Sequence, residues 1–72
     1  MYRMNRIKDI LIAEGRSQRW LAHQIGRSYA VTMNYCNNKT QPSILTLRKM
    51  ALAIQVDVRE LLVSTERFTQ KK

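Results

Sequence analysis

The chain has 72 residues, 44% of them apolar, and 13 Lys and Arg against five Asp and Glu give a net charge of +8. A chain of this length forms one small domain, and this composition is too apolar for a disordered protein. The single cysteine, Cys36, and the single histidine, His23, exclude an internal disulfide and a structural zinc site.

No apolar run approaches the roughly 20 residues that a membrane span needs. The first residues lack the apolar segment of a signal peptide. We therefore expect a soluble, cytoplasmic protein without a cofactor. The surplus of basic residues favours a polyanionic partner, either nucleic acid or an anionic membrane surface.

A first helix is predicted from about Asn5, as its N-cap, to about Glu14, with Gly15 ending it in the left-handed conformation. The helical spacing of apolar residues defines its buried face, which consists of Ile7, Ile10, Leu11, Ile12 and Ala13.

Two short helices follow, capped by Ser17 and Ser28 and separated by Gly26. The inward residues of the first of these are Leu21, Ala22 and Ile25. In the second they are Val31, Thr32 and Tyr35, and the opposite side carries Tyr29, Ala30, Met33, Asn34 and Asn37. This order predicts a helix-turn-helix at about residues 17–37.

A polar loop at residues 37–42 leads to a fourth helix from about Ser43 to Ile54, whose inward residues are Leu47, Met50, Ala51 and Ile54. Asp57 caps a short fifth helix that ends at about Val63. The sequence thus predicts an all-α, compact five-helix bundle as one domain over residues 1–63, followed by a basic, frayed tail at residues 64–72.

No acidic residue occurs between Glu14 and Asp57. The basic residues of this stretch are Arg16, Arg19, His23, Arg27, Lys39, Arg48 and Lys49. Like charges repel, so a one-signed stretch around a helix-turn-helix indicates a surface that binds a polyanion. Double-stranded DNA is the partner that fits both the charge and the helical pattern.

The chain also resembles a known family through residues whose order and spacing extend over about residues 5–63. They are Ser17-Gln18, Leu21-Ala22, Gly26, Ser28, Tyr35, Asn38, Pro42-Ser43, Leu47 and Met50-Ala51. This pattern is similar to the Xre family of phage-repressor-like, or lambda-repressor-like, helix-turn-helix domains. The resemblance implies that the third helix enters the major groove while the second lies across the DNA backbone.

When the contact roles of the family are carried over residue by residue, the resemblance implies that Gln18 contacts phosphate. It also implies that four residues of the third helix meet base edges: Tyr29, Ala30, Met33 and Asn34. The sequence departs from the family pattern at four positions, which are Arg27, Thr32, Cys36 and Asn38. Many members have an apolar residue, an Ile or Val, a Glu and a Gly there, respectively. Asn tolerates the positive φ that a glycine would supply.

Of the exposed side chains on the third helix, Asn34 is the one that can make a bidentate contact with adenine, while Met33 and Ala30 can pack on a thymine methyl group. The candidate contacts to the DNA backbone are Gln18, Arg19, Arg27, Ser28, Asn37 and Lys39. Several other residues have structural alternatives: Tyr35 and Cys36 as core, Trp20 as core or DNA surface, and Arg48 and Lys49 as solubility or phosphate contact.

The predicted fifth helix and the residue before its cap offer five apolar side chains, which at the helical spacing cannot all face one small core. They are Val56, Val58, Leu61, Leu62 and Val63. We therefore expect a homodimer, at least on DNA, through Val58, Leu62 and Phe68. A two-fold dimer would place two recognition helices about 34 Å apart on a palindromic operator.

The resulting prediction is a sequence-specific transcriptional regulator, a repressor of phage, mobile-element or own-operon type. The alternative is a protein-interaction module or antitoxin with the same fold and little or no DNA binding. Binding to a membrane surface would need one long amphipathic helix. Catalysis is not expected, because there are no paired carboxylates and no Gly-rich phosphate loop. There is also no room for a domain that binds a small-molecule ligand.

Overall fold

The computed structural model describes residues 3–64, which form four α-helices and one 3₁₀ helix. These elements are α1 (Ile7–Ala13), α2 (Gln18–Ile25), α3 (Tyr29–Cys36), α4 (Ile44–Ile54) and the 3₁₀ helix η1 (Val58–Leu61). Within residues 3–64 the only β-type pairing is an isolated antiparallel bridge between Asn5 and Leu62. The predicted all-α class is confirmed.

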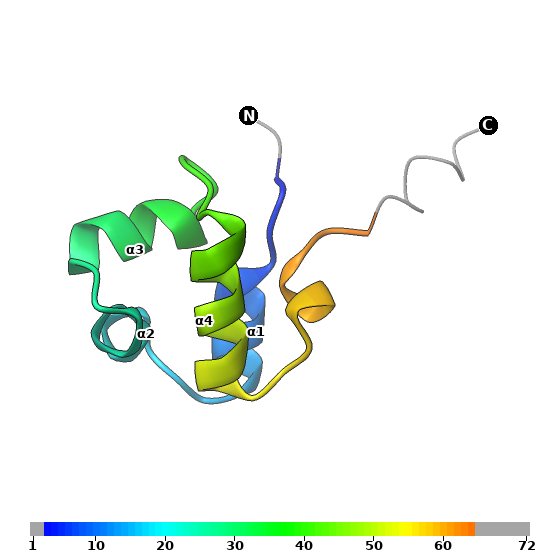
Figure 1. Cartoon of the computed structure of the whole chain (residues 1–72), viewed down its shortest axis with the longest axis horizontal. Coiled ribbons are helices and arrows are strands. Elements are labelled where there is room, and N and C mark those ends of the chain that lie inside the picture. Colours follow the sequence, from blue (N-terminus) through cyan, green and yellow to red (C-terminus); the bar gives the residue numbers. More distant parts are fainter. Residues whose placement is uncertain (1–2, 65–72) are drawn as a thin grey trace.

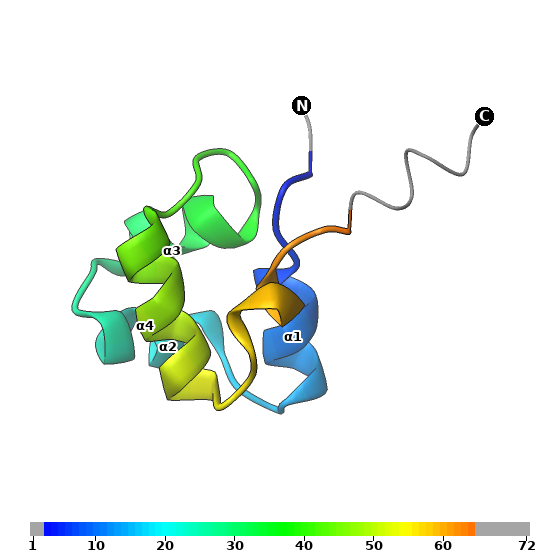
Figure 2. The same ribbon diagram turned by 45° about the vertical axis from the view of Figure 1, so that its right-hand side comes forward.

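Helix α4 packs directly against α2 and against η1. In Figure 1 α4 lies between the α2 and α3 pair and η1, and Figure 2 shows α1 and η1 together on the opposite side of the view from α2, α3 and α4. Every helix contributes to one core, because each has an apolar stripe that must be removed from water. The buried apolar residues are Ile7, Ile10, Leu11, Leu21, Ala22, Ile25, Cys36, Leu47, Met50, Ala51, Ile54 and Leu61. The inward residues predicted for α2 and α4 are all among them.

Three serines begin three of the helices. The hydroxyls of Ser17, Ser28 and Ser43 each accept a hydrogen bond from the backbone N–H three residues later, at distances of 3.0, 3.1 and 3.1 Å. Each bond satisfies one of the N–H groups that a helix start leaves without a partner. The predicted caps at Ser17 and Ser28 and the predicted helix start at Ser43 are confirmed. Gly15 has the predicted left-handed conformation, and Gly26, which was predicted to end α2 in a tight turn, has it too.

The first helix differs from its prediction in two respects. It begins at Ile7, with Arg6 at the N-cap position, although the Asn5 Oδ1 atom still accepts a hydrogen bond from the N–H of Ile7. Ile12 and Ala13 are exposed. The predicted wide face was therefore wrong, because Ile12 points away from the side of the helix that Ile7 and Ile10 share.

The predicted fifth α-helix is also corrected. Asp57 does cap the segment, accepting the N–H of Arg59 at 2.9 Å, but only one 3₁₀ turn forms before the backbone becomes extended at Leu62. The chain leaves the helical conformation there because Leu62 pairs with Asn5. The described fold thus has four α-helices, not five.

The buried face of α3 is shifted from its prediction. Thr32 and Cys36 are its buried residues, whereas Val31 is 38% exposed. The Thr32 hydroxyl donates to the carbonyl of Ser28 at 3.0 Å, so its burial leaves no polar atom without a partner. Tyr35 and Trp20 are half-buried against the core, as the packing interpretation predicted.

The longest described helix, α4, has 11 residues. No helix within residues 3–64 has the length and apolar character needed to traverse a bilayer. The predicted tail lies outside the described residues except for Ser64.

Candidate nucleic-acid interface

Helices α2 and α3 pack directly against each other and are joined by three residues, Gly26, Arg27 and Ser28. Gly26 has φ 68° and ψ 33°, a left-handed conformation that costs glycine little. The N–H of Arg27 then donates to the carbonyl of Ala22 at 3.1 Å, which closes the end of α2. This geometry is a helix-turn-helix at the predicted position.

The residues predicted to read bases lie on α3. Tyr29, Ala30 and Met33 are exposed, and Asn34 is half-buried. Within residues 3–64 the Asn34 side chain makes no hydrogen bond, although its backbone carbonyl accepts from the N–H of Lys39 at 2.9 Å. The carboxamide of Asn34 therefore keeps its donor and acceptor groups for a partner.

Two cation–π contacts organise the start of the helix-turn-helix. The guanidinium carbon of Arg19 lies 4.5 Å from the centre of the Tyr29 ring, and that of Arg16 lies 4.5 Å from the centre of the Trp20 ring. The first contact joins the first turn of α2 to the first residue of α3. It brings together a residue predicted to contact phosphate and one predicted to contact a base.

The predicted backbone contacts surround the exposed side of α3. Gln18 is half-buried and Arg19 is exposed, both in the first turn of α2. The others are exposed at the turn before α3 and just after its end: Arg27, Ser28, Asn37 and Lys39. The Ser28 hydroxyl oxygen accepts from the N–H of Val31, which leaves its hydrogen to be donated to a phosphate.

The charge of this region is not neutralised by the folded chain. Within residues 3–64 the ion pairs are Arg3 with Asp9 and Arg59 with Asp57, and both lie outside the acid-free stretch. Arg27 and Lys39 therefore present their charges to solvent, where they can attract phosphate.

The residues proposed for a dimer are only partly described. Val58 is 37% exposed and Leu62 is 43% exposed, whereas Phe68 lies outside the described residues. The outer side of α4 carries three exposed apolar residues that were not predicted as a surface: Ile44, Leu45 and Leu52, at 80%, 65% and 66%. These residues share the helical spacing of Arg48 and Lys49, and that spacing could have predicted an exposed apolar surface on α4.

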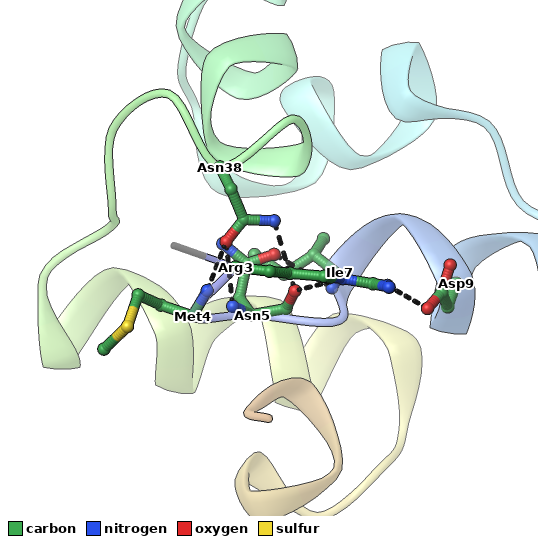
Figure 3. Close-up of polar contacts among 6 residues, drawn as sticks. All are labelled: Arg3, Met4, Asn5, Ile7, Asp9 and Asn38. Carbon is green, nitrogen blue, oxygen red and sulfur yellow. Dashed lines mark hydrogen bonds and ion pairs between the residues drawn. The ribbon is translucent and has the colours of Figure 1, made fainter. Parts of the chain in front are cut away.

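The interaction between two asparagines, Asn5 and Asn38, was also not predicted from the sequence. The Asn38 side chain, in the turn after α3, accepts from the backbone N–H groups of Met4 and Asn5 at 2.8 and 2.9 Å (Figure 3). The sequence predicted a cap at Asn5 and indicated that Asn38 tolerates a positive φ, and Asn38 does have φ 61°. It gave no reason to join them.

Comparison with known proteins places this geometry in a family. No protein-family model matches the chain, and no curated protein is similar to it. Among solved structures, a candidate DNA-binding protein from Bacteroides fragilis is 43% identical, with a TM-score of 0.82 over 83% of this chain and 97% of that chain. The chain belongs to the same family as this Bacteroides protein.

A second similar structure is a hypothetical transcription factor, NHTF, from Neisseria. It is 21% identical, with a TM-score of 0.73 over 93% of this chain and 77% of that chain. At this identity the likeness concerns the fold alone. The helix arrangement of the Bacteroides family therefore extends to a protein of quite different sequence.

Proposed function

We propose that the chain is a sequence-specific double-stranded DNA-binding protein of the Xre type that regulates transcription. The single observation that carries the proposal is the coincidence of the helix-turn-helix with an exposed, acid-free, basic surface. The family relationship to a candidate DNA-binding protein supports it.

In the proposed complex α3 enters the major groove, with Asn34 on adenine and Met33 and Ala30 against thymine methyl groups. Tyr29 reaches a base edge from the first turn. The start of α2, the turn and the end of α3 face phosphates through Gln18, Arg19, Arg27, Ser28, Asn37 and Lys39. These contacts set affinity, and the α3 contacts set sequence preference.

We further propose that the protein acts as a repressor and binds a palindromic operator as a homodimer. Val58 and Leu62 are exposed enough to contribute to a two-fold interface. Sedimentation of the protein alone and with its selected operator measures the stoichiometry. One protomer per operator in all conditions would exclude the dimer.

The exposed side of α4 favours a second candidate function, a protein-interaction module or antitoxin with little DNA binding. Ile44, Leu45 and Leu52 are large apolar side chains in water, and clustered exposure of this kind is typical of protein-binding surfaces. This function predicts that α4 variants lose a protein partner while duplex binding stays negligible.

Titration of labelled mixed-sequence duplex in dilute buffer, followed by selection of bound fragments, tests the proposed function. Arg27→Glu should abolish binding at moderate salt with the helical circular dichroism unchanged. Arg59→Glu on η1 is the matched control, since both variants lower the net charge from +8 to +6 (8 − 2). If neither the natural protein nor the control binds duplex at low salt, the proposal is overturned. An equal loss of affinity in both variants would remove Arg27 from the interface.

A further inference from the structure

The residues just before α1 form a short strap, defined here as residues 4–6. On one side the strap pairs with the last residue of η1 and the segment that follows it. The N–H of Arg6 donates to the carbonyl of Leu61 at 2.8 Å, and that of Val63 donates to the carbonyl of Met4 at 3.1 Å. Asn5, in the middle of the strap, is 1% exposed. The strap is therefore a fixed part of the fold.

On its other side the strap is held by Asn38. The Oδ1 atom of Asn38 accepts from the N–H groups of Met4 and Asn5, and its Nδ2 atom donates to the carbonyl of Asn5 at 3.2 Å (Figure 3). The Asn5 side chain donates in return to the carbonyl of Tyr35 at 2.9 Å and to Oε1 of Gln41 at 2.8 Å. Gln41 Nε2 completes the set by donating to Asn38 Oδ1 at 3.2 Å.

This network holds the turn that ends α3. Asn38 has φ 61°, so the chain reverses there, and the N–H of Lys39 returns to the carbonyl of Asn34 at 2.9 Å. Asn37 and Lys39, the two candidate phosphate contacts at this end of α3, flank Asn38 directly. Their positions relative to α3 therefore depend on the conformation of Asn38.

We propose that Asn38, supported by Asn5, is a positioning residue for DNA binding that holds Asn37 and Lys39 in place for phosphate. The proposal rests on the proposed function. Without these bonds the turn must be ordered each time the protein binds, and the entropy of ordering lowers affinity. Asn38 itself need not touch DNA.

The variant Asn38→Gly tests the proposal, because glycine accepts the positive φ while removing every side-chain bond. Gln55→Gly is the matched control. Gln55 is the other non-glycine residue with positive φ within residues 3–64, at 67°, and it ends α4 instead of α3. A general effect of glycine at a helix end would appear in both variants.

Asn38→Gly should lower duplex affinity about tenfold, and amide hydrogen exchange at Met4 and Asn5 should accelerate while the helical circular dichroism is retained. The slope of log affinity against log salt should also fall by about 0.9, the loss of one phosphate contact. A change in stability alone would not alter that slope. Gln55→Gly should match the natural protein in affinity and slope.

Unchanged affinity and slope in folded Asn38→Gly would overturn the positioning role while leaving the proposed function intact. Failure of the natural protein to bind any duplex would instead refute the proposed function. If Asn38→Gly does not fold, Gln41→Met provides the test, since Gln41 is exposed and its substitution removes only two bonds of the network. A loss of about two- to threefold is then expected, and no loss would overturn the proposal.

Discussion

The guanidinium of Arg19 lies over the ring of Tyr29, 4.5 Å from its centre, and so joins the first turn of α2 to the first residue of α3. A cation over an aromatic face is attracted by the ring quadrupole. Tyr29 is 39% exposed, and the contact with Arg19 restrains this surface side chain. The charge of Arg19 remains accessible to a phosphate beside it.

We predict that Arg19 and Tyr29 are energetically coupled in folding. A double-mutant cycle of Arg19→Met and Tyr29→Leu, measured by urea unfolding, should give a coupling free energy of about 0.5 to 1 kcal/mol. The cycle of Arg27→Met with Tyr29→Leu is the control and should be additive. Additivity in both cycles would mean that the stacked pair contributes nothing to stability.

Truncation of Asn34 and truncation of Lys39 should affect DNA binding in different ways. Asn34→Ala should cost about 1 to 3 kcal/mol on the selected operator and relax the preference at one base position, since a bidentate contact to adenine is lost. Lys39→Ala should weaken binding to all sequences alike and lower the salt slope by about one. Competition titrations with single-base operator variants measure both. Equal losses on specific and random duplexes for both variants would contradict the assigned roles.

Two serine caps allow stability to be separated from DNA contact. Ser28→Ala and Ser43→Ala each remove a hydroxyl that accepts one backbone N–H, so each should destabilise the fold by about 1 kcal/mol in urea unfolding. Only Ser28→Ala should also weaken duplex binding at temperatures where both variants are folded. Equal affinities for the two variants would remove Ser28 from the interface.

Cys36 should make stability sensitive to alkaline pH. Burial raises the pKa of its thiol from 9.0 to about 11, although nearby Lys8 acts in the opposite direction. The folded state holds the proton more tightly than the unfolded chain, so this contribution is complete below pH 9 and is lost as pH rises toward about 11. The free energy of unfolding is measured against pH for the natural protein and for Cys36→Ala, and the difference between the two profiles isolates the effect of the thiol. Identical profiles would show that the thiol does not titrate with folding.

The local features of the fold were predicted from the sequence because their causes are local. A serine accepts the N–H three residues on, a glycine takes a positive φ, and apolar residues recur with the helical period. These rules located α2, α3, α4 and the turn at Gly26 within a residue or two. The acid-free stretch is a property of the sequence alone, and it identified the surface that we propose to bind DNA.

Tertiary structure decided the features that depend on distant residues. Asn5 and Asn38 are 33 positions apart, and no periodicity or spacing predicts that their amides will meet. The same strap ends the fifth helix early, because Leu62 pairs with Asn5 in place of continuing a helical turn. The side of α3 that is buried follows from what packs against it, which is why Val31 is exposed where its helical position suggested burial. Local preference selects a conformation, but contacts across the fold determine which groups are removed from water.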